Sequence, residues 1–230
     1  AANGTTHAAM ELSSHALDQR RAAGTLIDAA VITNITQDHF DYHQTFEAYR
    51  QSKLRIMDYL KPAGIAVVNV DDPGSASCLD DAIKRTLTYG LEQPADVSAT
   101  IRHESLQGTL FTLNLSGITI DVHTPLVGRH NVSNALAAAA VANHFGIDKK
   151  DIAAGIESLV AVPGRMERVS VGQPFEVFVD YAHTDDALRH ALQSLRKLTP
   201  GRLLCVFGAG GDRDQLKRPK LGQASALADL

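Results

Sequence analysis

The sequence predicts an α/β fold, and three observations support this class. Apolar runs of strand length, such as DAAVITN at 28–34 and GIAVVNVDDPG at 64–74, alternate with segments of helical periodicity. The segment GTLFTLNLSGITIDVHTPL at 108–126 alternates apolar and polar residues around Ser116-Gly117, which is typical of an antiparallel hairpin. The alternation of strand and helix then restarts in the C-terminal part of the chain. We therefore predict a mostly parallel sheet that carries an antiparallel β-ribbon, followed by a second α/β region.

The N-terminal part accounts for most of the predicted elements. Apolar runs indicate buried strands at 6–12 and 28–34, with a helix between them that is closed by Gly24. A further helix is expected to begin after Thr45 as its N-cap. Two more helices follow the hairpin, at 134–144, ended by Gly146, and at 151–159.

The C-terminal part repeats the strand and helix pattern. It predicts a strand within 175–184, a helix at Asp185–Leu198 ended by Pro200-Gly201, a strand over 202–208 that enters a glycine turn, and a helix at the chain's end. The third glycine of a dinucleotide fingerprint would fall at Arg213, so that motif is excluded. We place the boundary near Pro163-Gly164 and predict domains at 1–164 and 165–230.

Composition excludes several classes of partner. The formal net charge is −4 and there is no Lys/Arg run, which argues against nucleic acid, and no apolar stretch approaches the roughly 18 residues of a membrane span. Cys78 and Cys205 are too few for a disulfide framework or a zinc site, as expected in a reducing cytoplasm. The chain begins without Met, and we expect it to be a fragment.

Lys53 is the most unusual residue in the predicted helix after Thr45. Phe46, Tyr49, Ile56, Met57 and Leu60 form one apolar stripe, and Lys53 lies in the middle of it. A buried amine of lowered pKa can take up carbon dioxide as a carbamate, whereas an ordinary lysine would extend its ammonium to water.

Two further residues are expected at the carboxyl edge of the sheet. Glu11 and His39 each follow a predicted strand and, together with a Lys53 carbamate, would suit Mg²⁺. Singly, they read as a capping glutamate and a structural histidine. The spacing of His39 and His43 could indicate a zincin helix, and otherwise both would be hydrogen-bonded structural histidines. The zincin motif requires Glu directly after the first His, and Phe40 stands there, so it is excluded.

Six motifs in this order resemble the Mur ligase family, and within it the tripeptide synthetases. They are MELSSHALDQ, TNITQDHFDYHQTFEAYRQSK, GRHNVSNALAAAA, VPGRMERV, VDYAHT and VFGAGGDRDQLKRP. The resemblance implies a P-loop-type ATP-binding central domain, without its N-terminal part, and the start of a Rossmann-like C-terminal domain. It implies an ATP-dependent ligase of peptidoglycan synthesis in the cytoplasm, a monomer that uses Mg²⁺ and joins a diamino acid, meso-diaminopimelate or L-lysine, to a UDP-N-acetylmuramoyl dipeptide.

The resemblance also assigns roles to single residues. Lys53, as a carbamate, and His39 would be catalytic, and with Glu11 they would hold Mg²⁺. Five residues would contact ATP, namely His130, Asn131, Asn134, Arg165 and Asp180. Four would contact the other substrates: Ser13, Gln19 and Arg21 the UDP-sugar dipeptide, and Arg213 the diamino acid.

Other interpretations stay open at this point. Asn131 would also suit the role of a helix cap, Arg165 that of a surface ion pair, and Gln19 and Arg21 that of exposed helix residues. The sequence contains no G-x-x-x-x-G-K-[ST] loop, so we expect this chain alone to lack ligase activity. The alternatives are another ligase of the superfamily, of the folylpolyglutamate or cyanophycin synthetase type, or a non-catalytic nucleotide-binding module.

Overall fold

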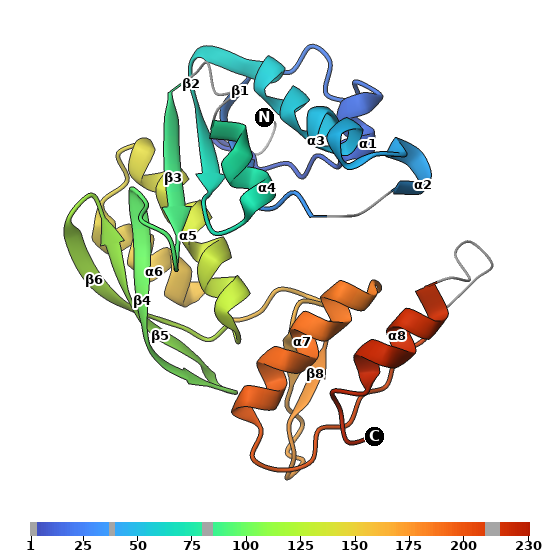
Figure 1. Ribbon diagram of the computed structural model, residues 1–230. Helices are drawn as coiled ribbons and strands as arrows, with labels where there is room; N and C mark the ends of the chain where they lie inside the picture. Colours follow the sequence, from blue (N-terminus) through green and yellow to red (C-terminus); the bar gives the residue numbers. More distant parts are fainter. Residues whose placement is uncertain (1–3, 37–39, 80–84, 210–216) are drawn as a thin grey trace. The chain divides into compact units, whose positions relative to one another are not determined.

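A computed structural model describes residues 4–36, 40–79, 85–209 and 217–230, and the chain forms two compact units (Figure 1). The first comprises residues up to Ser98 together with Ala137–His144, and the second comprises Ala99–Leu136 and Phe145–Leu230. These units are defined by contacts in space, whereas the boundary predicted after Gly164 divides the sequence into two continuous domains. That boundary stays a prediction. Of the helices in the described ranges, none is both long and apolar enough to cross a membrane.

The first unit is built on parallel strands, which confirms the predicted fold class. Strands β1 (Ile27–Ile32), β2 (Leu60–Asn69) and β3 (Thr86–Gly90) neighbour one another in this order, and β3 pairs with the first two residues of β4 (Val97–Ser105), whose remaining residues belong to the second unit. In β2, Ile65, Ala66, Val67 and Val68 are almost wholly buried. A continuous apolar run of this kind is typical of a strand covered on both faces, and it forms the centre of the unit.

Short helices lie before β1 and in the connections between β1, β2 and β3. They are α1 at Ser14–Asp18, α2 at Phe40–His43, α3 at Phe46–Leu54, α4 at Pro73–Ala76, and the 3₁₀ segments η1 at Arg55–Tyr59 and η2 at Ser77–Leu79. The helix predicted to run to Gly24 therefore ends early, at Asp18, and a series of turns follows in which Arg20 adopts φ 53°.

The strand predicted at 6–12 is wrong. Residues 4–13 belong to no helix or strand and are almost all exposed, and Met10 is 58% exposed. Two of the four apolar residues of this segment are alanines, which bury little surface, and a strand also needs a neighbour to bond its backbone. Glu11 consequently does not end a buried strand.

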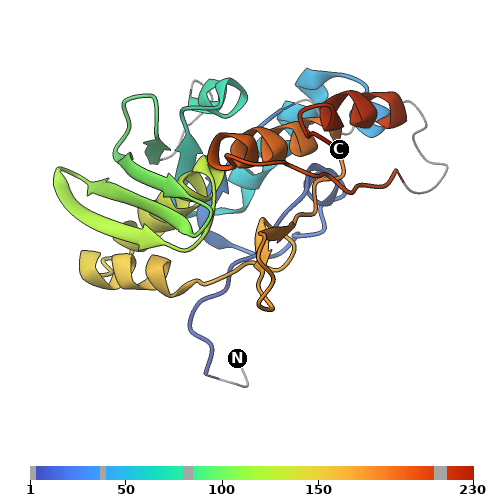
Figure 2. The same ribbon diagram turned by 90° about the horizontal axis from the view of Figure 1, so that it is seen from below.

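The second unit contains the predicted hairpin. Strand β5 (Gly108–Leu115) pairs antiparallel with β6 (Ile118–Thr124), and Leu115 lies opposite Ile118 across the Ser116-Gly117 turn. Both turn residues have positive φ, 52° and 86°, as a two-residue turn of the primed type requires. Helix α6 (Lys149–Ser158) packs on β6, and Figure 2 shows it lying along the hairpin.

Helix α5 (Arg129–His144) begins five residues before the predicted start, and its two halves belong to different units. Both α5 and α6 confirm predicted helices. Gly146, with φ 75°, follows α5 as expected of a residue that ends a helix.

The C-terminal part has its own small core. Helix α7 (Asp185–Leu198) matches its predicted range and packs beside α8 (Lys217–Ser225), as Figure 1 shows. Leu188, Leu192, Leu203, Leu221 and Ala224 form this core. A short antiparallel pair, β7 (Glu167–Val169) with β8 (Val177–Val179), precedes the helices. Strand β8 confirms the strand predicted within 175–184.

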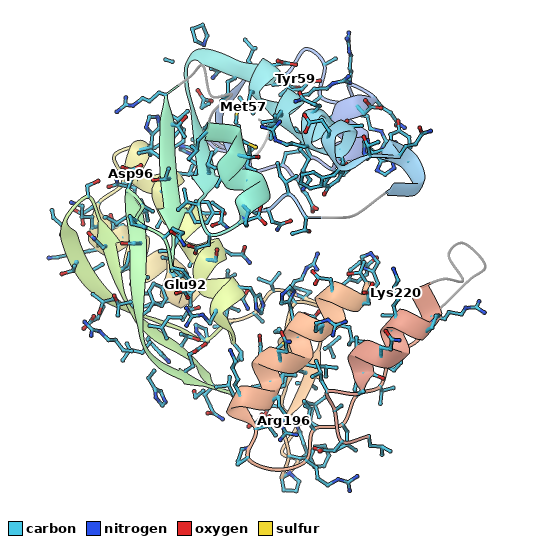
Figure 3. All side chains as sticks on the ribbon, viewed as in Figure 1. Met57, Tyr59, Glu92, Asp96, Arg196 and Lys220 are labelled. Carbon is cyan, nitrogen blue, oxygen red and sulfur yellow. The ribbon has the colours of Figure 1, made fainter. Side chains whose placement is uncertain are left out.

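The strand predicted over 202–208 is wrong. These residues belong to no strand, and Val206 is fully exposed. Their backbone is bonded to the chain end instead, since Cys205 N donates to Leu230 O at 2.7 Å. Asp229 accepts from Leu203 N and from Arg196, which Figure 3 labels near the end of α7. An apolar run forms a strand only where a partner strand supplies the ladder.

Candidate functional site

Lys53 lies in the last turn of α3, in the first unit. Thr45 is the N-cap of this helix, as predicted, because its Oγ1 accepts from Ala48 N at 3.1 Å. Lys53 Nζ donates to Asn34 O at 2.9 Å and lies 5.2 Å from the centroid of the Tyr49 ring. A backbone carbonyl and an aromatic face both favour a cation, so they define the place of the amino group.

The prediction that Lys53 lies in the middle of a buried stripe needs correction. Lys53 is half-buried, and Phe46 is 37% exposed. The α-helix ends at Leu54 and continues as a 3₁₀ turn, which changes the direction of the following side chains, and Leu60 already belongs to β2. Of the predicted stripe, Tyr49 is buried in a small core cluster, and Ile56 and Met57 are partly buried and pack against that cluster.

The carbonyl that receives Lys53 belongs to a held segment, Thr33–Ile35, immediately after β1. Asn69 Nδ2 donates to Thr33 O at 2.8 Å. Asp72 Oδ2 accepts from Ile35 N at 2.9 Å and also from Ser75 N at 2.7 Å, where Asp72 is the N-cap of α4. The residues on both sides of Asn34 are therefore bonded to the end of β2 and the turn after it.

The residues predicted to bind the UDP-sugar dipeptide lie at and after α1. Ser13 is the N-cap of this helix and its Oγ accepts from Ala16 N at 3.2 Å. Gln19 Oε1 accepts from Arg21 Nε at 3.0 Å and from Arg21 Nη2 at 2.6 Å, so these two exposed side chains are paired. The structure thus brings Gln19 and Arg21 together and leaves both accessible.

A buried contact next to Ser13 links α1 with α2. Ser14 Oγ and His43 Nε2 are 3.0 Å apart, and both residues are buried. At the end of α1, the Tyr42 hydroxyl donates to Asp18 at 2.8 Å and lowers the pKa of that carboxyl, with a smaller contribution from Arg55. The sequence alone does not single out Ser14, whereas the contact agrees with the interpretation of His43 as a hydrogen-bonded structural histidine.

The predicted Mg²⁺ ligands are only partly described. Glu11 is exposed in the irregular N-terminal segment, and His39 lies outside the described residues, as does Arg213. Among the residues with described positions, no three His, Cys, Asp or Glu side chains gather into a possible metal site. As an ammonium, Lys53 does not suit a cation, so the predicted ligand set requires its carbamate form.

The second unit brings two of the predicted ATP residues together. Asp180 Oδ2 accepts from Met166 N at 2.8 Å, and Tyr181 N donates to Gly164 O at 2.7 Å. These bonds place Arg165 beside Asp180, with the Arg165 guanidinium 5.6 Å from the centroid of the Tyr181 ring. Both charged residues are exposed, and both oxygens of Asp180 accept from backbone N–H groups, since Asp180 Oδ1 also accepts from Ala182 N at 2.9 Å.

The other three predicted ATP residues lie in the first turns of α5. Asn131 is buried and its Nδ2 donates to Val127 O at 2.8 Å, which holds the start of the helix, whereas Asn134 is exposed. His130 is exposed to solvent on one side, and its ring lies against Gly128 on another, where an added Cβ would come within 2.9 Å of it. Burial by these surroundings lowers the pKa of His130, and the nearby Asp180 opposes this effect.

The sequence as a whole matches known families. Residues 1–142 match the family described as "Mur ligase middle domain", and residues 164–229 match "Mur ligase, glutamate ligase domain".

Individual relatives match along almost the whole chain. UDP-N-acetylmuramoyl-L-alanyl-D-glutamate–2,6-diaminopimelate ligase from Geobacter metallireducens is 44% identical over 96% of this chain and 45% of the relative. The protein of the same name from Bacillus velezensis is 46% identical, over 96% of this chain and 47% of the relative. A solved structure with this name has a TM-score of 0.74 and 37% identity and covers 98% of this chain and 47% of that chain. The chain therefore spans about half the length of the curated relatives it matches.

Proposed function

The chain belongs to the Mur ligase family, and from this premise we propose that it forms part of an ATP-dependent ligase that adds a diamino acid to UDP-N-acetylmuramoyl-L-alanyl-D-glutamate. One observation carries the proposal: the identity of 44% to a ligase of that name extends over 228 residues, and so includes every candidate site residue. Because the relatives act with 2,6-diaminopimelate by name, we propose diaminopimelate as the diamino acid.

The proposed reaction has two steps. The γ-phosphoryl group of ATP passes to the free carboxylate of the dipeptide, which gives an acyl phosphate and ADP. The amino group of diaminopimelate then attacks the acyl carbon, the amide bond forms, inorganic phosphate leaves, and the amine loses a proton. Both steps depend on placing reactants in line and neutralising charge, which a protein achieves with fixed cations and dipoles.

The residues of the second unit suit the nucleotide. We assign the Arg165 guanidinium to the phosphates and the Asp180 carboxylate to the ribose hydroxyls, since both residues are exposed and the backbone beside Arg165 is bonded to Asp180. His130 and Asn134 would contact the adenine side. Asn131, whose amide already bonds Val127 O, would hold the helix start in place for them.

The residues of the first unit suit the sugar dipeptide and the metal. Ser13, Gln19 and Arg21 are exposed at one helix and the turn after it, where Gln19 orients the Arg21 guanidinium toward an anion. Lys53 would react as a free amine with carbon dioxide: an N–C bond forms, a carbonyl electron pair moves to oxygen, and a proton leaves the nitrogen. The carbamate, with Glu11 and His39, would hold Mg²⁺, which when bound neutralises phosphate charge.

The test uses the complete protein. We expect ATP-dependent phosphate release that requires both UDP-N-acetylmuramoyl-L-alanyl-D-glutamate and meso-diaminopimelate, with L-lysine as the control amine and EDTA as the control for the metal. Release that ignores the UDP-sugar dipeptide would overturn the proposal. We further propose a monomer in the cytoplasm, and light scattering would test the first statement.

A further inference from the structure

We propose that Asn69 and Asp72 are positioning residues for Lys53. They hold the segment Thr33–Ile35, whose central carbonyl, at Asn34, receives Lys53 Nζ. This inference rests on the proposed role of Lys53 but concerns residues to which no role has been assigned above.

Three consecutive residues of this segment are each bonded to a side chain from elsewhere in the unit. Asn69 Nδ2 bonds Thr33 O at 2.8 Å, Lys53 Nζ bonds Asn34 O at 2.9 Å, and Asp72 Oδ2 bonds Ile35 N at 2.9 Å. The peptide unit that faces Lys53, Asn34 C=O with Ile35 N–H, is thus held at its N–H by Asp72 in the turn after β2, and the preceding carbonyl is held by Asn69 at the end of β2. A carbonyl without such bonds would be free to rotate away from the amino group.

The segment Thr33–Ile35 is packed against a buried apolar cluster through Ile35. Ile35 is 2% exposed and belongs to a core with Ile32, Tyr49 and Cys78. Gly74 lies so close that an added Cβ would come within 2.1 Å of Ile35 O. Because Tyr49 also faces Lys53 Nζ, the carbonyl and the ring that surround the amino group are set by the same packed cluster.

Each of the two positioning side chains makes two hydrogen bonds to backbone groups. Asn69 is 8% exposed, and its amide bonds both ways, since its Oδ1 accepts from Asp71 N at 3.0 Å. Asp72 uses one oxygen for two backbone N–H groups, at Ile35 and Ser75. Short polar side chains with several backbone bonds are well suited to fix one loop against another. The active lysine would therefore depend on a loop contact that lies 37 residues from Asp72 in sequence.

Asp71 offers a matched control. It is adjacent to Asp72, is also half-buried, and accepts from Leu91 N, Glu92 N and Gln93 N at 2.5, 3.0 and 2.9 Å. Its side chain thus holds a different loop. Asp71→Ala therefore removes a carboxylate that is half-buried like Asp72 and also accepts from several backbone N–H groups, but it leaves the hydrogen bonds of the Thr33–Ile35 segment in place.

The first measurement is acylation of Lys53 by a small anhydride in the complete protein without substrates, read by mass spectrometry. Lys61, which is paired with Asp28 at 2.8 Å, serves as the internal reference. Asp72→Ala should raise Lys53 labelling about fivefold, the factor that one net hydrogen bond represents. Asp72→Asn keeps an acceptor oxygen and should label like the wild type, as should Asp71→Ala.

The second measurement is steady-state ligation. Asp72→Ala should lower kcat roughly tenfold or more with the KM for ATP unchanged, and Asp72→Asn should restore most of it. Asn69→Ala, which leaves Asp72 intact, should likewise raise the labelling of Lys53 and lower kcat. This variant provides the test if Asp72→Ala does not fold. Equal labelling and equal kcat for Asp72→Ala and Asp71→Ala would overturn the inference. A wild-type protein without ligation would instead refute the proposed function, and the labelling result would still decide the inference.

Discussion

Gly74→Ala should destabilise the protein, although alanine is the better helix former. Gly74 lies in α4, and an added Cβ would meet Ile35 O at 2.1 Å and Ile35 C at 3.0 Å. Ordinary contact needs roughly 3.5 Å, so the buried Ile35 backbone would have to move by more than about 1 Å.

The magnitude follows from what that movement disturbs. Overpacking of a well-packed site costs about 1–3 kcal/mol, and the bond from Ile35 N to Asp72 adds about 1 kcal/mol. The helical preference of alanine over glycine returns about 0.5–1 kcal/mol. We expect a net loss of about 1–3.5 kcal/mol in the free energy of unfolding.

Gly155→Ala is the matched control. Gly155 lies inside α6, is exposed, and has no atom within 4 Å of an added Cβ. The same substitution should therefore stabilise the protein by about 0.5–1 kcal/mol. Both variants would be unfolded in urea and followed by circular dichroism. If Gly74→Ala were as stable as the wild type, the close approach of Gly74 to Ile35 would be refuted.

Three further predictions concern the proposed site, the chain end and the hairpin. In the complete protein, Lys53→Met should fold but have no ligase activity. Acetate should partly restore the activity of Lys53→Ala, because it supplies a carboxylate in place of the carbamate. An active Lys53→Met enzyme would exclude the carbamate. Hydrogen bonds from Leu203 N and Arg196 hold the pKa of Asp229 below its usual value. The ionised Asp229 therefore stabilises the fold at pH values above its unfolded pKa of about 4, and this stabilisation is lost as the pH falls through the lower pKa of the folded state. Asp229→Asn should thus unfold earlier than the wild type at pH 7, with the difference vanishing at the lowest pH; an equal difference at both would contradict this. Ser116→Asn should raise the thermal midpoint, because asparagine tolerates the φ of 52° better, with Ser116→Val lowering it as the opposite control.

The structure confirms those elements whose signals are local. Ser116-Gly117 sets the register of the hairpin, because two residues of positive φ leave the flanking strands one way to pair. Thr184 caps α7 by accepting from Ala187 N, and Leu188 and Leu192 recur on one face of it, so the helix occupies the predicted range. Nearest neighbours along the chain decide these features.

The tertiary structure decided the rest, since it depends on residues far apart in sequence. Whether 6–12 and 202–208 form strands depends on a neighbouring strand, and their apolar runs carry no information about one. The sequence could place Lys53 on a helix, but its partner, Asn34 O, lies 19 residues away, and the Asp72 bond beside that carbonyl spans 37. In Asp-Asp-Pro-Gly at 71–74, Pro73 favours Asp72 as a helix N-cap, but nothing in it shows that Asp72 also holds the Lys53 loop or that Asp71 holds another loop. Only the packing of β2 against β1 makes that distinction, because it brings the ends of two parallel strands to the same edge of the sheet.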